Sequence, residues 1–129
     1  MLGHAFPREA RLRTRSDFRR VLSKGLRIHT RHFILYVLST TDETCRLGVT
    51  VSRKVGNAVV RNRIKRCVRE AFRLELRSGE QPYDLVVIAK NPKAGTAKQK
   101  TCTLVKKYTL NLVTEELNYG IRRYLSTVS

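Results

Sequence analysis

Residues Val60–Arg73 read VRNRIKRCVREAFR, which is the pattern of a helix with one apolar and one cationic face. A helix turns by about 100° per residue, so residues three and four apart share a face. The apolar arc holds Val60, Ile64, Cys67, Val68, Ala71 and Phe72, and the cationic arc holds Arg61, Asn62, Lys65, Arg66, Arg69 and Arg73. Like charges at this spacing repel one another, and Glu70 is the only acid in the stretch. We therefore expect an external polyanion, such as a nucleic-acid backbone, to cover the cationic arc.

The whole chain carries the same excess of positive charge. Its 129 residues include 27 Lys and Arg against 10 Asp and Glu, a net charge of +17, which favours a nucleic-acid partner. No apolar run approaches the roughly 20 residues that span a bilayer, and no signal-like segment opens the chain. We therefore expect a cytoplasmic protein without a membrane partner. The hydrophobic content of 41% suffices for one compact domain.

The cysteines and histidines do not form a metal-binding pattern. Cys45, Cys67 and Cys102 are odd in number and far apart, which is typical of reduced thiols in a cytosolic protein. His29 and His32 have no second pair of ligands at zinc spacing, so no zinc site is predicted, and protein ligands for any other metal stay unknown.

The chain divides into a basic arm, residues 1–15, and one RNA-binding domain, residues 16–129. Ser16 is predicted to cap the first helix, and Gly25 to end it. Asn57 is predicted to cap the cationic helix, which extends to about Leu76.

Three runs have the composition of strands. Two of them, 32–38 and 45–52, are separated by a polar loop over 39–44 and are predicted to form a hairpin, with a possible short strand over 53–56. The third, 83–89, is nearly continuous in apolar residues and is predicted to be central in the sheet. With one or two helices between Thr96 and Tyr124, the class is α+β, a small sheet with helices mostly on one side.

Catalysis by the polypeptide itself is not predicted. The acids are few and show no spacing typical of paired carboxylates or of a nucleophile with its base. Binding is better supported, because Arg61, Lys65 and Arg69 form a ridge for phosphates and Asn62 beside them can bond a sugar, phosphate or base edge. The alternative is a solvated helix face that only keeps the protein soluble.

Apolar and aromatic residues suggest a second surface. Phe18 and Leu22 are four apart on the first helix, and on the first predicted strand Ile34 and Tyr36 face away from Phe33 and Leu35. Unpaired bases stack on such groups, but packing between helix and sheet explains the same spacing. Both explanations stay open.

The stretch GNAVVRNRIKRCVREAFR, Gly56–Arg73, strongly resembles the signature of the bacterial ribonuclease P protein subunit, whose arginine-asparagine-arginine motif stands here as Arg61, Asn62 and Arg63. The resemblance covers most of the chain, since RLRTRSDFRRVL, RHFILYVL, RLGVTVSRKVGNAV and YDLVVIAKNP follow in the expected order. It implies a ribosomal protein S5 domain 2-like fold, a mostly antiparallel sheet with a left-handed βαβ crossover made by the motif helix. The common right-handed crossover would otherwise be expected.

The resemblance also implies a function. The protein would be the non-catalytic subunit of an endonuclease that removes the 5′ leader of precursor tRNA, with chemistry done by the catalytic RNA and Mg²⁺. The partners would be that RNA and precursor tRNA, and no obligate protein partner is expected.

Site residues follow from the resemblance position by position. The motif residues that would face the catalytic RNA are Arg61, Asn62, Arg63, Lys65, Arg66 and Arg69. The residues that would line the cleft for the single-stranded leader are Phe18, Leu22, Tyr36 and Lys54. Some relatives have an aromatic residue at Leu22, so apolar contact rather than stacking is expected there, and no RNA site is assigned after Ala94. A ribosomal protein or ribosome-assembly factor that binds rRNA is the alternative, and a DNA-binding module is less favoured.

Overall fold

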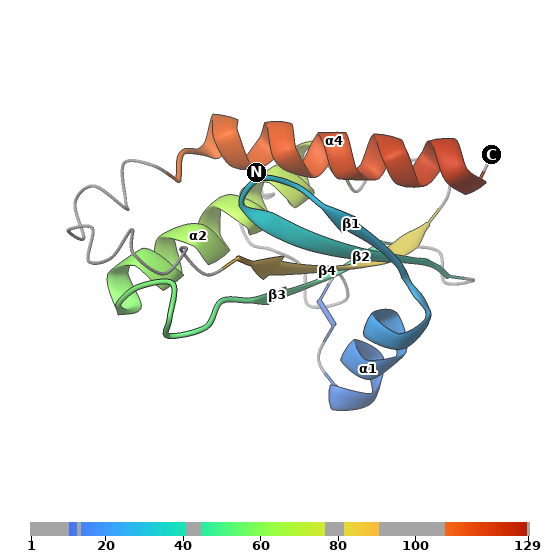
Figure 1. Ribbon diagram of the computed structural model, residues 1–129, viewed down its shortest axis with the longest axis horizontal. Helices are drawn as coiled ribbons and strands as arrows, with labels where there is room; N and C mark the ends of the chain where they lie inside the picture. Colours follow the sequence, from blue (N-terminus) through green and yellow to red (C-terminus); the bar gives the residue numbers. More distant parts are fainter. Residues whose placement is uncertain (1–10, 13, 41–44, 77–81, 91–107, 129) are drawn as a thin grey trace, which may run out of the picture.

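The computed structural model describes residues 11–12, 14–40, 45–76, 82–90 and 108–128. Its elements are α1 (Arg15–Lys24), β1 (Leu26–His29), β2 (Phe33–Ser39), β3 (Arg46–Thr50), α2 (Ala58–Ala71), the π-helical turn η2 (Phe72–Leu76), β4 (Tyr83–Ala89) and α4 (Leu110–Val128). Figure 1 shows them as a sheet with helices on both faces.

The four strands form one mixed sheet in the order β1-β2-β4-β3. β4 lies between β2, to which it is antiparallel, and β3, to which it is parallel. The predicted hairpin over 39–44 is therefore wrong, because β4 separates the two strands that it would join. β4 takes this central place since it is buried on both faces along nearly its whole length.

The hairpin partner of β2 is β1, a strand that the sequence pattern did not predict. β1 has only four residues, LRIH, of which Ile28 alone is buried. So short a run carries too little alternation to be recognised. The short strand considered over 53–56 is a turn instead.

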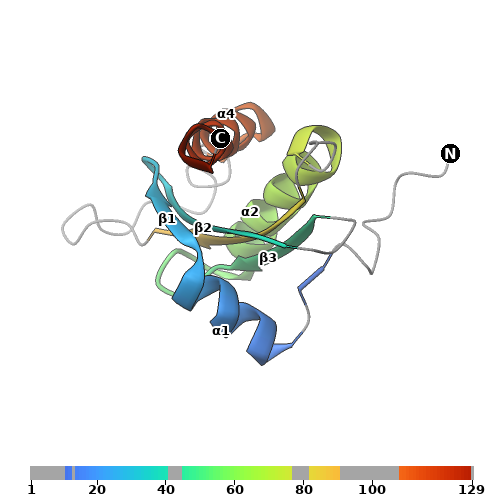
Figure 2. The ribbon, with the colours of Figure 1, turned by 90° about the vertical axis from the view of Figure 1, so that its right-hand side faces the viewer.

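The crossover from β3 through α2 to β4 is left-handed. β3 and β4 are parallel neighbours, and α2 returns on the face of the sheet that it shares with α4 (Figures 1 and 2). Connections of this kind are right-handed in about 98% of cases. The hand implied by the family resemblance is thus confirmed against the general expectation.

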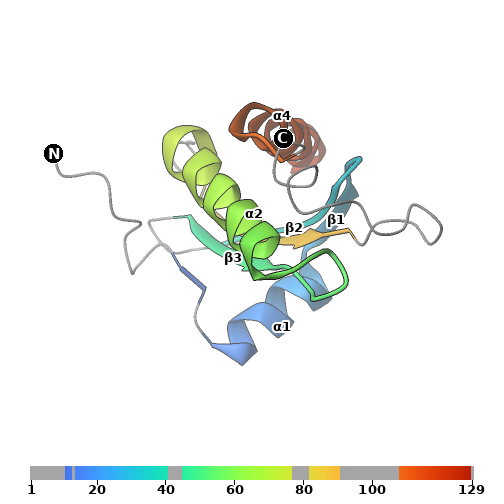
Figure 3. The ribbon, with the colours of Figure 1, turned by 90° about the vertical axis from the view of Figure 1, so that its left-hand side faces the viewer.

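The apolar arc of α2 is the main source of its packing energy. Val60, Ile64, Cys67, Val68 and Ala71 are all buried in the main core, together with Phe72 of η2. α4 covers the rest of the same face, and its backbone comes close to β2, because a Cβ on Gly120 would lie 2.6 Å from Leu35 Cδ2. Figure 3 shows α2 and α4 side by side on this face, with α1 on the other.

Three of the four predicted helix ends are confirmed. Asn57 Oδ1 accepts from the Val60 N–H at 3.1 Å, Gly25 ends α1, and α2 with η2 reaches Leu76. Ser16, however, is not the cap of α1. Thr14 Oγ1 accepts from the Asp17 N–H at 3.1 Å, so the helix begins two residues earlier, at Arg15.

α1 is tied to the sheet by a buried carboxylate. Asp84 on β4 has no exposed surface, and its oxygens accept from Arg46 Nε at 3.0 Å and from Arg46 Nη2 at 2.9 Å. Arg20 of α1 donates to the same carboxylate at 2.9 Å. A buried charge without partners is costly, so the bond from Arg20 helps to hold α1 against the sheet.

Replacing this carboxylate should destabilise the protein measurably. Asp84→Asn removes the nearest counter-charge of two guanidiniums and should lower the free energy of unfolding by about 2 to 3 kcal/mol. This loss is smaller than for a fully buried pair, because the arginines stay partly exposed. Asp17→Asn is the matched control, since its ion pairs are longer, 3.6 and 4.0 Å, and should cost under about 1 kcal/mol. Equal losses in urea unfolding would contradict the role of Asp84.

A second polar cluster fastens α4 to the turn between β1 and β2. Glu116 accepts from Thr30 Oγ1 at 2.6 Å and from the His32 N–H at 2.8 Å, and its second oxygen is bonded to His32 Nδ1. Burial alone would raise the pKa of Glu116, but these hydrogen bonds outweigh burial and lower the pKa below its usual value.

The lowered pKa predicts a pH-dependent contribution to stability. The ionised carboxylate stabilises the fold fully above the unfolded pKa near 4.5, and this stabilisation disappears as the pH falls through the lower folded pKa. The difference in unfolding free energy between the wild type and Glu116→Gln should therefore shrink between about pH 5 and pH 3. Glu115→Gln, its exposed neighbour, should show no such change, and a constant difference for Glu116→Gln would exclude this explanation.

Candidate nucleic-acid interface

Burial of the apolar arc leaves the opposite side of α2 in solvent. Asn62, Arg66 and Arg69 are exposed, and Arg61, Arg63 and Lys65 are half-buried. The structure thus brings all six residues predicted for the catalytic RNA to the outer surface of one helix. Which of them touch RNA stays a prediction.

Two of the six also bond the protein itself. Arg61 Nε donates to the Gly56 carbonyl at 3.2 Å, within the turn that leads into α2. Arg63 Nε donates to the Tyr108 carbonyl at 3.1 Å and so links α2 to the chain just before α4. Cys67 Sγ donates to the same carbonyl at 3.7 Å, and burial raises the pKa of its thiol, which fits a packed, unreactive cysteine.

The single acid of the helix does not neutralise this surface. Glu70 is engaged by Arg73, with Nε donating to Oε1 at 2.9 Å and Nη2 to Oε2 at 3.2 Å. Arg73, which the sequence pattern placed on the cationic arc, is therefore paired within the protein. The other cations of the arc keep their excess charge.

A residue of the predicted basic arm joins the cationic surface. Arg11 forms a parallel bridge with Leu47 on β3, and the Leu12 N–H donates to the Leu47 carbonyl at 3.0 Å. Partial burial and the positive charge of Arg11 lower the pKa of Arg69. Sequence reasoning missed this pairing, because only the tertiary structure brings residues 58 positions apart together, and the extent of the arm, 1–15, stays a prediction.

The second surface lies on the other side of the sheet, under α1 (Figure 2). Phe18 and Tyr36 are half-buried there and pack around Val21 and Val86. Phe18 requires a glycine opposite, since a Cβ on Gly48 would lie 2.5 Å from Phe18 Cζ. These side chains pack between helix and sheet, as the second explanation requires, and both remain partly exposed. Stacking of unpaired bases on them stays a prediction.

The two remaining leader residues are exposed. Leu22 is 40% exposed on α1, beside this cluster in sequence but outside its packed core. Lys54 lies in the turn after β3, beyond the end of the sheet opposite to α1. The structure therefore does not gather all four predicted residues into one small cleft.

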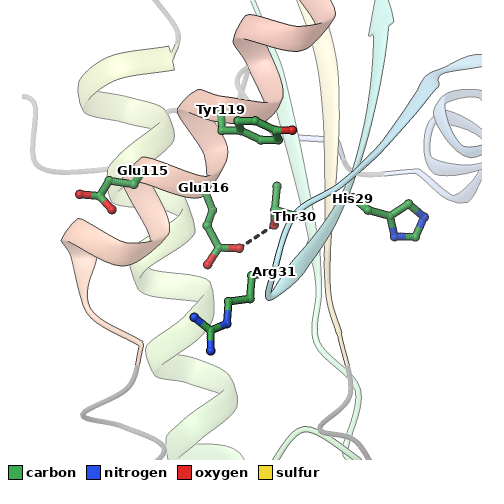
Figure 4. Close-up of a pocket in the computed structure, with 6 residues that line it drawn as sticks. All are labelled: His29, Thr30, Arg31, Glu115, Glu116 and Tyr119. Carbon is green, nitrogen blue, oxygen red and sulfur yellow. Dashed lines mark hydrogen bonds between the residues drawn. The ribbon is translucent and has the colours of Figure 1, made fainter.

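A separate hollow of about 410 Å³ lies on the α4 side of β1, at the turn before β2 (Figure 4). It contains the Glu116 cluster described above and the half-exposed ring of Tyr119. The Glu116 carboxylate is already bonded to Thr30 and His32, so we assign a structural role to this cluster.

Within the residues that the structure describes, no three His, Cys, Asp or Glu side chains come together as a metal site. None of the described helices has the length and apolar character to cross a bilayer.

Comparison with known proteins decides the family. The family model named Ribonuclease P matches residues 6–113. The chain belongs to the bacterial ribonuclease P protein family. It is thus a protein component of ribonuclease P, the ribonucleoprotein endoribonuclease that processes the 5′ leader of precursor tRNA. A match of this extent rejects the ribosomal alternative.

Individual relatives agree with the family model. The chain is 56% identical over 74 residues to the ribonuclease P protein component of Geotalea uraniireducens, a match that covers 57% of this chain and 66% of the relative. It is 42% identical over 94 residues to that of Exiguobacterium sibiricum, covering 72% and 81%.

Solved structures confirm the fold. The RNase P protein of Staphylococcus aureus matches with a TM-score of 0.69 and 31% identity, over 89% of this chain and 94% of that one. The protein of Thermotoga maritima matches with a TM-score of 0.68 and 30% identity, over 88% and 96%. The predicted α+β, S5 domain 2-like class is confirmed.

The hydrogen bond of Arg63 gives a test that needs no RNA. Arg63→Ala should lower the free energy of unfolding by about 1 to 2 kcal/mol, because the Tyr108 carbonyl loses a charged donor. Arg66→Ala is the matched control, since it removes the same charge from an exposed position of the same helix. Similar unfolding curves for the two variants would show that the Arg63 bond contributes nothing.

Proposed function

We propose that the outer side of α2 docks this chain on the catalytic RNA of ribonuclease P. The observation that carries the proposal is the division of α2 into a fully buried apolar arc and a cationic arc whose one acid is already paired. Phosphates offset such charge best. The residues assigned to this contact are Arg61, Asn62, Arg63, Lys65, Arg66 and Arg69.

We further propose that the face under α1 holds the single-stranded leader of precursor tRNA. Phe18 and Tyr36 offer ring edges to unpaired bases, Leu22 adds apolar contact, and Lys54 adds charge near a phosphate. Because α1 and α2 lie on opposite faces of the sheet, one chain can contact both RNAs at once (Figure 3).

The proposed division of labour leaves the chemistry to the RNA. The acids of the described network, Asp17 and Asp84, are paired with arginines, so these residues do not fit a magnesium site. We assign Mg²⁺ to the catalytic RNA and the substrate. The polypeptide binds and orients the two RNAs, and its cations offset the repulsion between them.

Residues 16–129 act as one RNA-binding domain with a basic arm before it. The protein works in the cytoplasm, with catalytic RNA and precursor tRNA as partners and without an obligate second protein.

Leader cleavage tests this function directly. Mixed with its catalytic RNA and a precursor tRNA at low Mg²⁺, the purified protein should stimulate cleavage, because its cations replace part of the screening by magnesium. The protein alone should cleave nothing. Absence of stimulation under conditions where a Staphylococcus aureus relative stimulates its own RNA would refute the proposal.

Substitutions on the two surfaces should weaken the binding of different RNAs. The double variant Arg66→Ala, Arg69→Ala should weaken binding to the catalytic RNA and reduce the slope of log affinity against log salt by about one to two. Phe18→Ala should leave that slope unchanged and weaken the binding of precursor tRNA relative to mature tRNA. Arg122→Ala, an exposed cation on α4, is the control for charge alone, and equal effects of the variants on both ligands would contradict two separate surfaces.

A further inference from the structure

The two arginines of the motif, Arg61 and Arg63, lie at the two rims of the exposed side of α2. They are about 200° apart around the helix, and both are half-buried. Arg61 Nε donates to the Gly56 carbonyl at 3.2 Å. Arg63 Nε donates to the Tyr108 carbonyl at 3.1 Å. Arg66, which lies between the rims, makes no hydrogen bond to the residues that the structure describes. The motif arginines are thus held in place, whereas Arg66 is not.

The bond at Nε determines which part of the Arg63 guanidinium can meet a ligand. A guanidinium carries N–H donors on Nε and on both Nη nitrogens, all in one plane. Because Nε is bonded to the Tyr108 carbonyl, the edge that includes Nε is closed. Neither Nη nitrogen bonds another residue in the described part of the chain. Arg63 can therefore hold a phosphate through two parallel N–H groups, but only end-on.

Tyr108 is itself fixed by contacts with the turn between β1 and β2. It is buried, two residues before α4, and its ring meets those of His32 and Phe33 edge-on, with centroids 5.8 and 6.3 Å away. His32 is in turn bonded to Glu116 of α4. The Tyr108 carbonyl therefore has a defined place beside α2, where α2 and α4 lie side by side (Figure 3).

Holding an arginine before it binds strengthens the contact that it makes. A long side chain that becomes ordered only on binding loses rotamer freedom, which opposes association. A guanidinium that is already held in place loses less of this freedom. Arg63 should therefore contribute more affinity than Arg66, although both carry the same charge.

We infer that Tyr108 is a positioning residue for the catalytic RNA, because its carbonyl holds Arg63 so that Nη1 and Nη2 meet a phosphate end-on. This inference rests on the proposed docking of α2 and adds to it a residue outside that helix. The exposed cations between the rims supply charge without a fixed geometry. The Arg63 contact thus sets the register of the helix on the RNA.

Substitutions that conserve charge test the geometry. Arg63→Lys cannot bond the Tyr108 carbonyl and a phosphate through one rigid plane, so the affinity for the catalytic RNA should fall by about fivefold or more. The slope of log affinity against log salt should stay the same, because the number of cations is unchanged. Arg66→Lys is the matched control and should lose only about twofold. Equal losses for the two variants would overturn the inference.

Paired substitutions measure the contribution of Tyr108. Tyr108→Leu keeps an apolar side chain but removes the ring contacts, and should weaken the affinity for the catalytic RNA about threefold. Tyr108→Phe keeps the ring and should restore the affinity. The loss from Tyr108→Leu should vanish in the Arg63→Ala background and persist in the Arg66→Ala background, because only Arg63 acts through Tyr108.

NMR of the arginine side chains in the free protein reports the bond itself. The Nε–H of Arg63 should be protected from exchange with water in the wild type and in Tyr108→Phe, and should lose this protection in Tyr108→Leu. The Nε–H of Arg66 should exchange rapidly in all three proteins. An unprotected Arg63 signal in the wild type would also overturn the inference.

The outcomes distinguish the inference from the function on which it rests. If neither Arg63→Ala nor Arg66→Ala weakens the binding of the catalytic RNA, the docking of α2 and the role of Tyr108 are both wrong. If both do, but Tyr108→Leu has the same effect in either background, the docking stands and Tyr108 has only a structural role. If Tyr108→Leu does not fold, the comparison of Arg63→Lys with Arg66→Lys decides, because both arginines lie outside the core.

Discussion

The burial of one side of α2 between the sheet and α4 is the contact on which the rest of the molecule depends. Five apolar side chains of this helix enter the main core, and the helix connects two neighbouring parallel strands. Its orientation about its own axis is therefore fixed by packing. The cationic arc therefore faces outward, so the helix that stabilises the fold also exposes the residues that we propose to bind RNA.

β4 has the corresponding role in the sheet. It is buried on both faces and pairs with strands from different parts of the chain, so helices pack against both faces of the sheet. One side packs against α2 and α4. The other carries α1 at one end, held by the Asp84 carboxylate, and leaves half-exposed apolar side chains at the other. The separation of the two surfaces that we propose for RNA follows from this layering.

Much of the local structure was predictable from the sequence. The period of Val60–Arg73 identified the buried and exposed sides of α2, Asn57 and Gly25 were recognised as caps, and the composition of Tyr83–Ala89 indicated a central strand. These features depend on residues within a few positions of one another. Predictions failed where distant residues compete, as in the hairpin over 39–44, or where the run was too short, as in β1. The assignment of Ser16 as a cap failed because Thr14, two residues away, offers an equivalent hydroxyl.

The motif residues illustrate the same limit. Nothing in the sequence distinguishes Arg63 from Arg66, yet one bonds a carbonyl 45 residues away and the other is exposed.

By itself, the sequence determined that the chain is a basic α+β protein with one strongly amphipathic helix and the signature of the ribonuclease P protein family, because periodicity, caps and charge are local properties. Only the tertiary structure decided the strand order, the left-handed crossover, the partners of Arg63 and Asp84, and the ring contacts of Tyr108. Each of these is set by contacts between residues far apart in the chain, whose pairing depends on how the whole sheet and its helices pack together.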